Sequence, residues 1–542
     1  MKKVSSIALA LLFAASAFAH EQIGQLNPYA YGVQGQAKNG KIAVQYSLNA
    51  PADSTVIAIY CDEVEVGTQV VADNAPGLHS AVVDFSTFTA SGTYTVGIRV
   101  YATPYDKPFQ LKEILDGSTD TTALNYGFDH PKGVDIDVDP FSENFGRLLA
   151  VECLYDQNEK WWSQGKPGIY AFDATFKPIP NGNDRGFYGN YPYAYEMNEK
   201  VYNANNKLQN IAYAPYRVRI SKDGRIFVST QDDKGSALYE ISADLQTWTP
   251  IFNGAFNSDC VVLDADRNYI TGLNCGLDVI GEGEDLEIIM LNGSKASYTS
   301  FSGNDYMVAH YKIGANTVWN SAATQADTLS KFVGTAAVPV MGSAGIACDD
   351  KGGFWFHSAR SNMIDQRGLC HVSAAGAVDF EFHATAADSA KYHILPNGSN
   401  GGAGVRVIKL DGEDVLFVGQ GRRAADGTGH MMAYKVIYAA DGTVSDLEVL
   451  YDEHFIGIST NLNDFAVDFG HNLFVVGNSN EKLIPVALPY SGMNETPVDA
   501  QVIITALDNV NGEMKATKMI ENGKVIIIKN GVKYDMLGTV IE

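Results

Sequence analysis

The feature that most constrains this chain is a loose repeat between residues 125 and 505. Each unit has an apolar, alternating strand that ends at or just before an Asp, then a turn, often with Gly, then a strand rich in Phe and Val. The clearest copy is PYRVRISKDGRIFVST, where Asp223 and Gly224 form the turn. The marker residues are Asp139, Asp223, Asp266, Asp350, Asp411 and Asp468. A unit of about 40–60 residues with three or four strands predicts the blades of a β-propeller.

These copies resemble the six-bladed propellers of the NHL-repeat and gluconolactonase families. The resemblance implies six blades. Seven are possible because two of the separations between consecutive marker residues are long. Enzymes of the gluconolactonase type hold a divalent metal with Glu, Asn and Asp at the propeller mouth. Residues of this chain that could occupy such positions are Asp135, Asp259, Asn463 and Asp464. The resemblance therefore implies a metal-dependent lactonase as one alternative function.

The first nineteen residues have the three-part build of a secretory signal. Lys2 and Lys3 precede an apolar stretch, and Ala17-Phe18-Ala19 provides small residues for signal peptidase. We expect cleavage after Ala19 and export to the cell surface or medium, with the periplasm as the fallback. No later segment is apolar over about 18 residues, so the sequence predicts no membrane span.

Residues 20–105 form a first unit with short alternating strands between turn clusters. Strands are expected at Lys41–Leu48, Thr55–Tyr60, Ala81–Phe85 and Tyr94–Tyr101. The closing stretch GTYTVGIRV resembles the Ig-like fold of FlgD-type domains. That resemblance implies a β-sandwich that acts as a spacer.

Residues 507–542 differ from the repeat. Asn522-Gly523 and Asn530-Gly531 bracket the apolar strand Lys524–Lys529. The elements ENGKVIIIKNG, Lys533-Tyr534 and Leu537-Gly538 resemble the C-terminal sorting domains of type IX secretion cargo. The resemblance implies that the export machinery of the cell envelope is a partner. The alternative is a closing hairpin that packs on the propeller.

Charge and motif content exclude several function classes. The formal net charge of −24 argues against nucleic acid and anionic lipid as partners, because both require basic surfaces. The sequence contains no HExxH, GxSxG, Walker or CxxC motif. Six Cys are too few for a disulfide scaffold; Cys260–Cys275 and Cys348–Cys370 could pair or stay free.

Three acidic residues at alternate positions, Asp135, Asp137 and Asp139, offer a weak candidate for calcium. An EF-hand loop needs Gly at its sixth position, but Pro140 follows the third Asp there, so that motif is not met. The favoured interpretation is a strand whose Val134, Ile136 and Val138 face the core and whose acids face water.

Aromatic residues gather in the region between the first two markers. Exposed aromatic rings suit sugar rings or peptide side chains, because they offer stiff contact area. The same tyrosines could instead pack a long loop. Arg360 and Arg422 follow the second strands of their repeat units and could line a polar mouth of the propeller. The ligand-binding candidates are Trp161, Trp162, Tyr188, Tyr191, Tyr193, Tyr195, Arg360 and Arg422.

The sequence thus predicts an all-β chain with an Ig-like sandwich at 20–105, a propeller at 125–505 and a short C-terminal β-segment. The favoured function is an exported, non-enzymatic protein that binds an extracellular glycan or protein, without a cofactor unless calcium is bound. The alternatives are a metal-dependent lactonase or glycan-cleaving enzyme, and a structural docking protein for cationic extracellular proteins.

Overall fold

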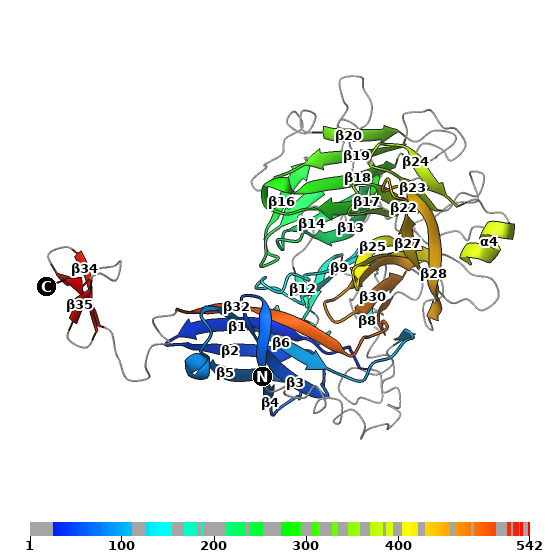
Figure 1. Ribbon diagram of the computed structural model, residues 1–542. Helices are drawn as coiled ribbons and strands as arrows, with labels where there is room; N and C mark the ends of the chain where they lie inside the picture. The colour runs from blue at the N-terminus through cyan, green and yellow to red at the C-terminus, as the bar shows by residue number, and fades with distance from the viewer. Residues whose placement is uncertain are drawn as a thin grey trace.

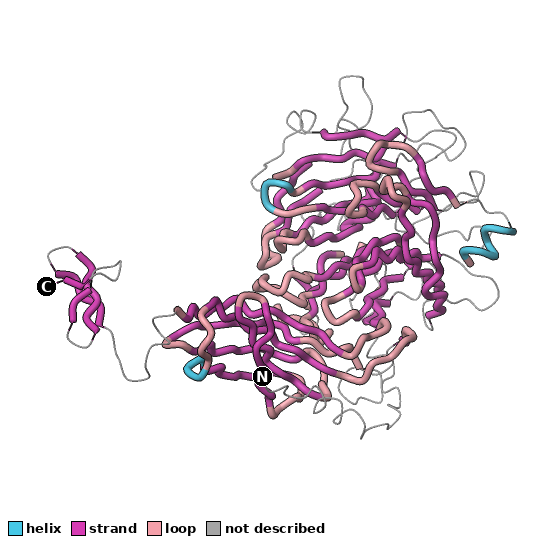
Figure 2. The backbone as a smooth tube through the Cα atoms, in the orientation of Figure 1, coloured by secondary structure: helices cyan, strands magenta, loops and turns pink. Residues whose placement is uncertain are grey.

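The computed structural model is almost entirely β, as the sequence predicts, with one described α-helix, α4 (Ala386–Tyr392) (Figure 2). The structure describes residues 25–110, 126–128, 131–153, 167–181, 186–188, 212–232, 238–252, 273–293, 306–314, 328–333, 345–357, 369–382, 386–393, 404–420, 429–455, 462–477, 482–505, 517–521, 524–529, 532–534 and 540–541.

Six antiparallel sheets follow one another along the chain. The first contains β9 (Pro131–Ile136), β10 (Leu148–Glu152), β11 (Gly168–Phe172) and β12 (Phe187–Tyr188). The second contains β13 (Ala212–Ile220), β14 (Ile226–Asp232), β15 (Leu238–Ile241) and β16 (Trp248–Phe252). The third contains β17 (Leu273–Ile280), β18 (Glu287–Gly293), β19 (Tyr306–Lys312) and β20 (Thr328–Val333).

The remaining three sheets repeat this order. The fourth contains β21 (Gly345–Cys348), β22 (Phe354–His357), β23 (Leu369–Val372) and β24 (Val378–Glu381). The fifth contains β25 (Val405–Leu410), β26 (Glu413–Gln420), β27 (Gly429–Tyr438) and β28 (Val444–Phe455). The sixth contains β29 (Leu462–Val467), β30 (Asn472–Gly477) and β31 (Lys482–Ala487).

The first strands of the six sheets form a closed ring. β9 contacts β13, and the contacts continue through β17, β21, β25 and β29 back to β9. This is the arrangement of a six-bladed β-propeller, with the first strand of each blade innermost. The sequence prediction of a propeller is confirmed, and the ring supplies the blade count that the sequence left open.

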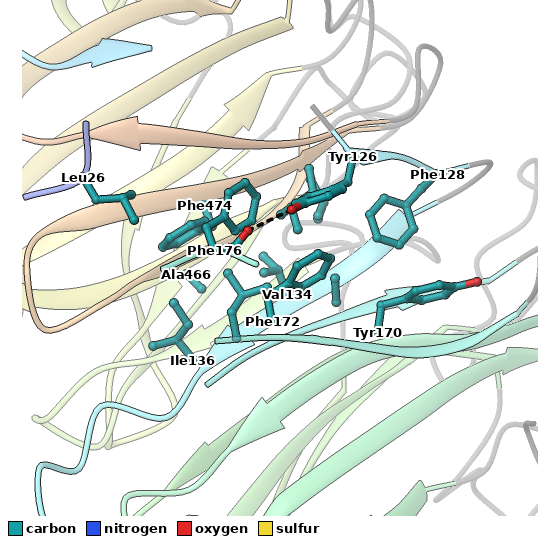
Figure 3. Close-up of a cluster of buried hydrophobic side chains, with 14 of the residues drawn as sticks. Leu26, Tyr126, Phe128, Val134, Ile136, Tyr170, Phe172, Phe176, Ala466 and Phe474 are labelled. Carbon is teal, nitrogen blue, oxygen red and sulfur yellow. Dashed lines mark hydrogen bonds between the residues drawn. The ribbon is translucent and has the colours of Figure 1, made fainter. Parts of the chain in front are cut away.

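The ring is locked by strands that precede the first blade. β7 (Phe109–Gln110) and β8 (Tyr126–Gly127) both pair with β31 and complete the sixth blade. A buried cluster seals the seam between the first and sixth blades, and Figure 3 shows its aromatic rings converging there. Within it the Tyr126 hydroxyl donates to the Phe176 carbonyl oxygen at 3.0 Å. The propeller strands therefore begin at Phe109, earlier than residue 125.

A two-layer sandwich stands beside the propeller (Figure 1). One sheet holds β1 (Ala30–Lys38), β2 (Lys41–Leu48) and β5 (Gly77–Asp84). The other holds β32 (Met493–Ile504), β6 (Gly92–Tyr101), β3 (Ser54–Cys61) and β4 (Val64–Val71). Side chains of both sheets share one buried core. The four strands expected from the sequence are present; that the sandwich is Ig-like stays a prediction.

The strand β32 corrects the domain boundaries. Residues 493–504 were assigned to the propeller from the sequence, but β32 pairs along β6 of the sandwich (Figure 1). Glu495 accepts from the Arg99 Nε at 2.6 Å, and the Thr496 hydroxyl donates to the Ala30 carbonyl oxygen at 2.9 Å. The sandwich is thus built from both ends of the chain, and the propeller is inserted between β6 and β32.

The first hairpin of the third blade is formed by β17 and β18, joined through residues 281–286. This turn contains Glu282 and Asp285. The expected marker Asp266 lies outside the described residues.

The C-terminal segment forms its own four-stranded sheet. It contains β33 (Thr517–Glu521), β34 (Lys524–Lys529), β35 (Val532–Tyr534) and β36 (Val540–Ile541). The sheet is drawn in red, apart from the sandwich (Figure 1). The strand expected at Lys524–Lys529 is confirmed, and it pairs within this sheet rather than on a blade.

The thiols Cys348 and Cys370 are free and buried. β22 separates their strands, so their backbones are about 10 Å apart at the usual strand spacing, too far for a disulfide. Cys260 lies outside the described residues. Within the described parts of the chain, no helix is long and apolar enough to cross a membrane.

Candidate functional site

The two faces of the propeller differ. We call the face where the first strand of each blade ends the turn face, because a short turn joins the first strand to the second in five of the six blades. These turns span residues 221–225, 281–286, 349–353, 411–412 and 468–471. The opposite end is called the connection face. The three longest connections between described propeller strands, 189–211, 253–272 and 382–404, all join strand ends at the connection face. Loop length on one face of a rigid scaffold is typical of a ligand-binding face.

The sandwich occupies the turn face near the first and sixth blades. Asn27 donates through Nδ2 to the His471 and Leu488 carbonyl oxygens at 3.2 Å each. The Tyr29 ring packs against Phe145 and Phe469, which lie in the first connections of the first and sixth blades. These contacts between the described parts of the sandwich and the propeller all lie on the turn face.

A buried charge network crosses the centre of the ring. Arg219 of β13 binds Asp464 of β29 with both guanidinium Nη atoms, at 2.6 and 2.9 Å. Its Nε lies 3.4 Å from Asp278 of β17. Arg406 of β25 reaches Asp135 of β9 at 2.8 Å and the same Asp278 at 2.9 Å. Two arginines thus join five of the six blades through three carboxylates.

The same carboxylates also tie three of the blades to the blade that follows. The Val134 N–H donates to Asp464, and the Ile220 N–H donates to Asp135 at 2.8 Å. The Cys348 N–H donates to Asp278, also at 2.8 Å. In all three cases an Asp on one innermost strand accepts from the backbone of the following blade. These bonds join the innermost strands of neighbouring blades.

Burial and charge act in opposite directions on these groups. Burial raises the pKa of Asp135, and the nearby arginines only partly offset it. Burial also raises the pKa of Asp464, but Arg219 more than offsets this, so the net shift is downward. Burial lowers the pKa of Arg219, whereas Asp464 raises it, and the net shift is upward. The pair Arg219–Asp464 is therefore held fully ionised.

This network has no free carboxylate to offer a metal ion. Each of its three carboxylates accepts from an arginine and from a backbone N–H. Among the described residues, no group of three or more His, Cys, Asp or Glu could hold a metal ion. Of the mouth positions implied by the gluconolactonase resemblance, Asp135 and Asp464 join the network. Asn463 donates to the Pro131 carbonyl oxygen, and Asp259 lies outside the described residues.

A second polar group lies nearer the connection face. Arg217, which is 1% exposed, places its guanidinium carbon 4.7 Å from the Tyr216 ring centroid and donates through Nη1 to the Lys132 carbonyl oxygen. Its Nη2 has no hydrogen-bond partner within the described part of the chain. Ser229, directly across the strand pair, is fully buried, and its hydroxyl likewise has no partner among those residues.

The alternating acids do not behave as the sequence predicted. Asp135 and Asp137 are 4% and 2% exposed, whereas Val138 is 47% exposed. Asp137 accepts from the Ser142 hydroxyl at 2.6 Å inside the first connection. Asp139 accepts from the Phe141 N–H at 3.0 Å. The expectation of wet acids was wrong for Asp135 and Asp137, whereas Asp139 is half-buried. Asp135 is buried because β9 is an innermost strand, and Asp137 is buried within the first connection. The described geometry gives no calcium cage, since the three carboxylates serve separate partners.

Tyr188 is the described member of the aromatic set, and it is not a loop residue. It belongs to β12 and is half-buried against the cluster between the first and second blades. Burial raises the pKa of Tyr188, and Arg147 lowers it, with burial the larger effect. The other candidates, Trp161, Trp162, Tyr191, Tyr193, Tyr195, Arg360 and Arg422, lie outside the described residues. Their connections, 153–167, 189–211, 358–368 and 421–428, all begin and end at the connection face.

Sequence reasoning missed the arginines and Asp278. A signal for the arginines was present, because Arg219 and Arg406 each lie in the first, apolar strand of a repeat unit. A charged residue in a strand expected to be innermost requires a buried partner. The position of that partner depends on ring closure, since Arg219 and Asp464 are 245 residues apart.

No family model matches the sequence, and no curated protein matches it. Solved structures similar to the chain include a glucose dehydrogenase, at 12% identity and a TM-score of 0.37, covering 67% of this chain and 98% of that one. The soluble aldose sugar dehydrogenase of Escherichia coli gives 12% identity and a TM-score of 0.36, covering 67% and 97%. The calcium-binding protein regucalcin of Agrobacterium tumefaciens gives 10% and 0.34, covering 68% and 95%. With TM-scores below 0.5, the propeller assignment rests on the strand pairing of this chain itself.

Proposed function

We propose that this protein is an exported binding protein that presents the connection face of its propeller to an extracellular glycan or protein. One observation carries the proposal. The connections that contain the predicted aromatic and arginine ligand residues begin and end at one face, and the sandwich docks on the opposite face.

The chemistry of the channel supports binding over metal-dependent catalysis. Its carboxylates are neutralised by Arg219 and Arg406, so they act as ties between blades. A lactonase of the gluconolactonase type would need such oxygens directed at a divalent metal. Stoichiometric calcium or zinc in the purified protein would favour the enzymatic alternative instead.

The ends of the chain support delivery to the cell exterior. We expect the predicted signal at 1–19 to direct export, and the separate sheet formed by β33 to β36 would serve as the sorting segment. After signal removal the chain loses two lysines and becomes more acidic than −24. A cationic protein partner would then associate faster at low salt.

A glycan array and a pull-down with the mature chain test this proposal. We expect a ligand whose binding falls by at least about tenfold when Trp161 and Trp162 are both changed to Ala, because stacked aromatics contribute about 1.4 kcal/mol or more. The matched control is Lys222→Ala with Glu282→Ala, an exposed pair on the turn face, which should leave binding unchanged. Hydrolase activity without any ligand retained would refute the proposal, as would binding lost only in the control.

A further inference from the structure

Two buried polar atoms on opposed residues of the second blade lack partners among the described residues. Arg217 is 1% exposed and Ser229 is fully buried. Among the described residues, none accepts from Arg217 Nη2 and none bonds the Ser229 hydroxyl. Buried polar groups in folded proteins are nearly always satisfied by protein, water or ligand, and the requirement is strongest for a charged donor.

These two atoms point to the same side of the blade. Arg217 and Ser229 are directly opposed in the β13–β14 pair, so their side chains share one face of the sheet. Their neighbours Val218 and Val228 belong to the core shared with the first blade, so the Arg217 side faces away from that core. Both residues therefore present a donor on the same side of the β13–β14 pair, and neither donor has a partner among the described residues.

Arg217 is also held in place rather than free to swing. Its guanidinium lies over the Tyr216 ring, and its Nη1 is occupied by the Lys132 carbonyl oxygen. Its Nη2 has no partner within the described part of the chain. Arg219, two residues along the same strand, has both Nη atoms bound by Asp464. The contrast indicates that the Arg217 end of the channel is built for an acceptor that the chain does not supply.

We infer that Arg217 and Ser229 bind an oxyanion, a carboxylate or a phosphate, that the ligand brings to the connection-face end of the channel. An oxyanion is the acceptor that suits a guanidinium and a hydroxyl together, since it takes charge-assisted bonds from both. This inference rests on the proposed binding function and specifies an acidic ligand, such as a saccharide with a carboxylate group. The burial of both donors means that the bound oxyanion is enclosed.

The test measures the thermal unfolding midpoint of the mature chain with sodium glucuronate, inorganic phosphate or glucose, with sodium chloride at the same ionic strength as reference. We expect either oxyanion to raise the midpoint and glucose to leave it unchanged. A response to glucuronate alone assigns the site to a sugar acid, and a response to both assigns it to the oxyanion group itself. A midpoint that neither oxyanion raises above chloride would overturn the inference and leave buried water as the partner.

Variants locate the effect. Titration calorimetry should show at least about 30-fold weaker binding for Arg217→Met, the loss of about one charge-assisted pair, and a smaller loss of about fivefold for Ser229→Ala. The control is Arg225→Met, because Arg225 lies at the turn-face end of the same blade with Glu240 and the Gly314 carbonyl oxygen as partners. Oxyanion affinity should be unchanged in this control.

If Arg217→Met does not fold, Ser229→Ala decides alone, because removing an unpartnered hydroxyl leaves the core intact. Wild-type affinity in Ser229→Ala and in any folded Arg217 variant would overturn the inference. Neutral glycans bound on the array without any dependence on Arg217 would leave the binding proposal standing and refute only the oxyanion site.

Discussion

Removal of the Arg219 guanidinium tests whether the central charge network holds the propeller together. In Arg219→Met, Asp464 loses two bonds of 2.6 and 2.9 Å, and Asp278 loses a contact at 3.4 Å. Both Arg219 and Asp464 have side chains that are only 1% exposed. Breaking one partner of such a buried pair costs about 3–5 kcal/mol, because the remaining charge cannot be hydrated.

The assay is thermal unfolding of the mature chain, followed by tryptophan fluorescence and repeated by calorimetry. At about 2 °C per kcal/mol for a unit of this size, we expect the midpoint of the propeller transition to fall by roughly 6–10 °C. The double variant Arg219→Met with Asp464→Asn should recover most of this loss, since a neutral amide at 464 can still accept from the Val134 N–H.

Two further results separate this explanation from a general packing defect. Lys222→Met removes an exposed pair with Glu282 and should not shift the midpoint measurably. The loss in Arg219→Met should shrink as the pH is lowered toward the acid range, because Asp464 can then take up a proton. A loss below about 1 kcal/mol, or no recovery in the double variant, would refute the role given to the network.

Three other predictions follow from single features. Truncation after residue 515 should leave the unfolding transitions of the sandwich and propeller nearly unchanged while abolishing surface display. Truncation after residue 492 removes β32 and should unfold the sandwich. Calorimetry with surface labelling checks both, and equal stability of the two products would contradict the β32 assignment. Gly133→Ala should lower the free energy of unfolding by about 1–3 kcal/mol in a denaturant titration, because its Cβ would lie 2.8 Å from the Val218 N and 2.9 Å from the Arg217 Cα. In the control, Gly67→Ala, the added Cβ meets nothing within 4 Å and the stability should be nearly unchanged. Similar midpoints for the two variants would argue against close packing of β9 on β13. Burial lowers the pKa of His357 to about 4 from an unfolded value of 6.5. The contribution of neutral His357 to folding stability is therefore complete above pH 6.5 and is lost as the pH falls toward 4. Relative to His357→Gln, the wild type should lose up to about 3 kcal/mol of stability across that window. Parallel pH profiles of the two unfolding midpoints would rule this out.

Some of the fold was predictable because its information is local. Alternation of apolar residues indicates strands such as Lys41–Leu48 and Lys524–Lys529, and an Asp with a following Gly marks turns such as 221–225. The marker role of Asp468 is confirmed, since its carboxylate accepts from the Gly470 and Asn472 N–H groups at 2.8 Å each. At the fourth blade the neighbouring Asp349, not Asp350, accepts from the turn backbone.

The failures of prediction share one cause, which is that pairing across long separations leaves no local pattern. Period-two alternation shows which side of a strand is buried but not which strand lies beside it. β32 reads like a propeller strand, yet it pairs with β6 some four hundred residues earlier. The sequence therefore assigned it to the wrong unit.

The central channel depends most on tertiary structure. The sequence by itself determined an acidic, all-β chain with a repeated strand unit and a distinct C-terminal β-segment. Ring closure decided that Asp135 is buried, that Arg219 meets Asp464 and that Arg217 retains an unused donor. The physical reason is that only six blades set side by side bring their innermost strands within reach of one another, and a charge becomes buried or paired only when that enclosure exists.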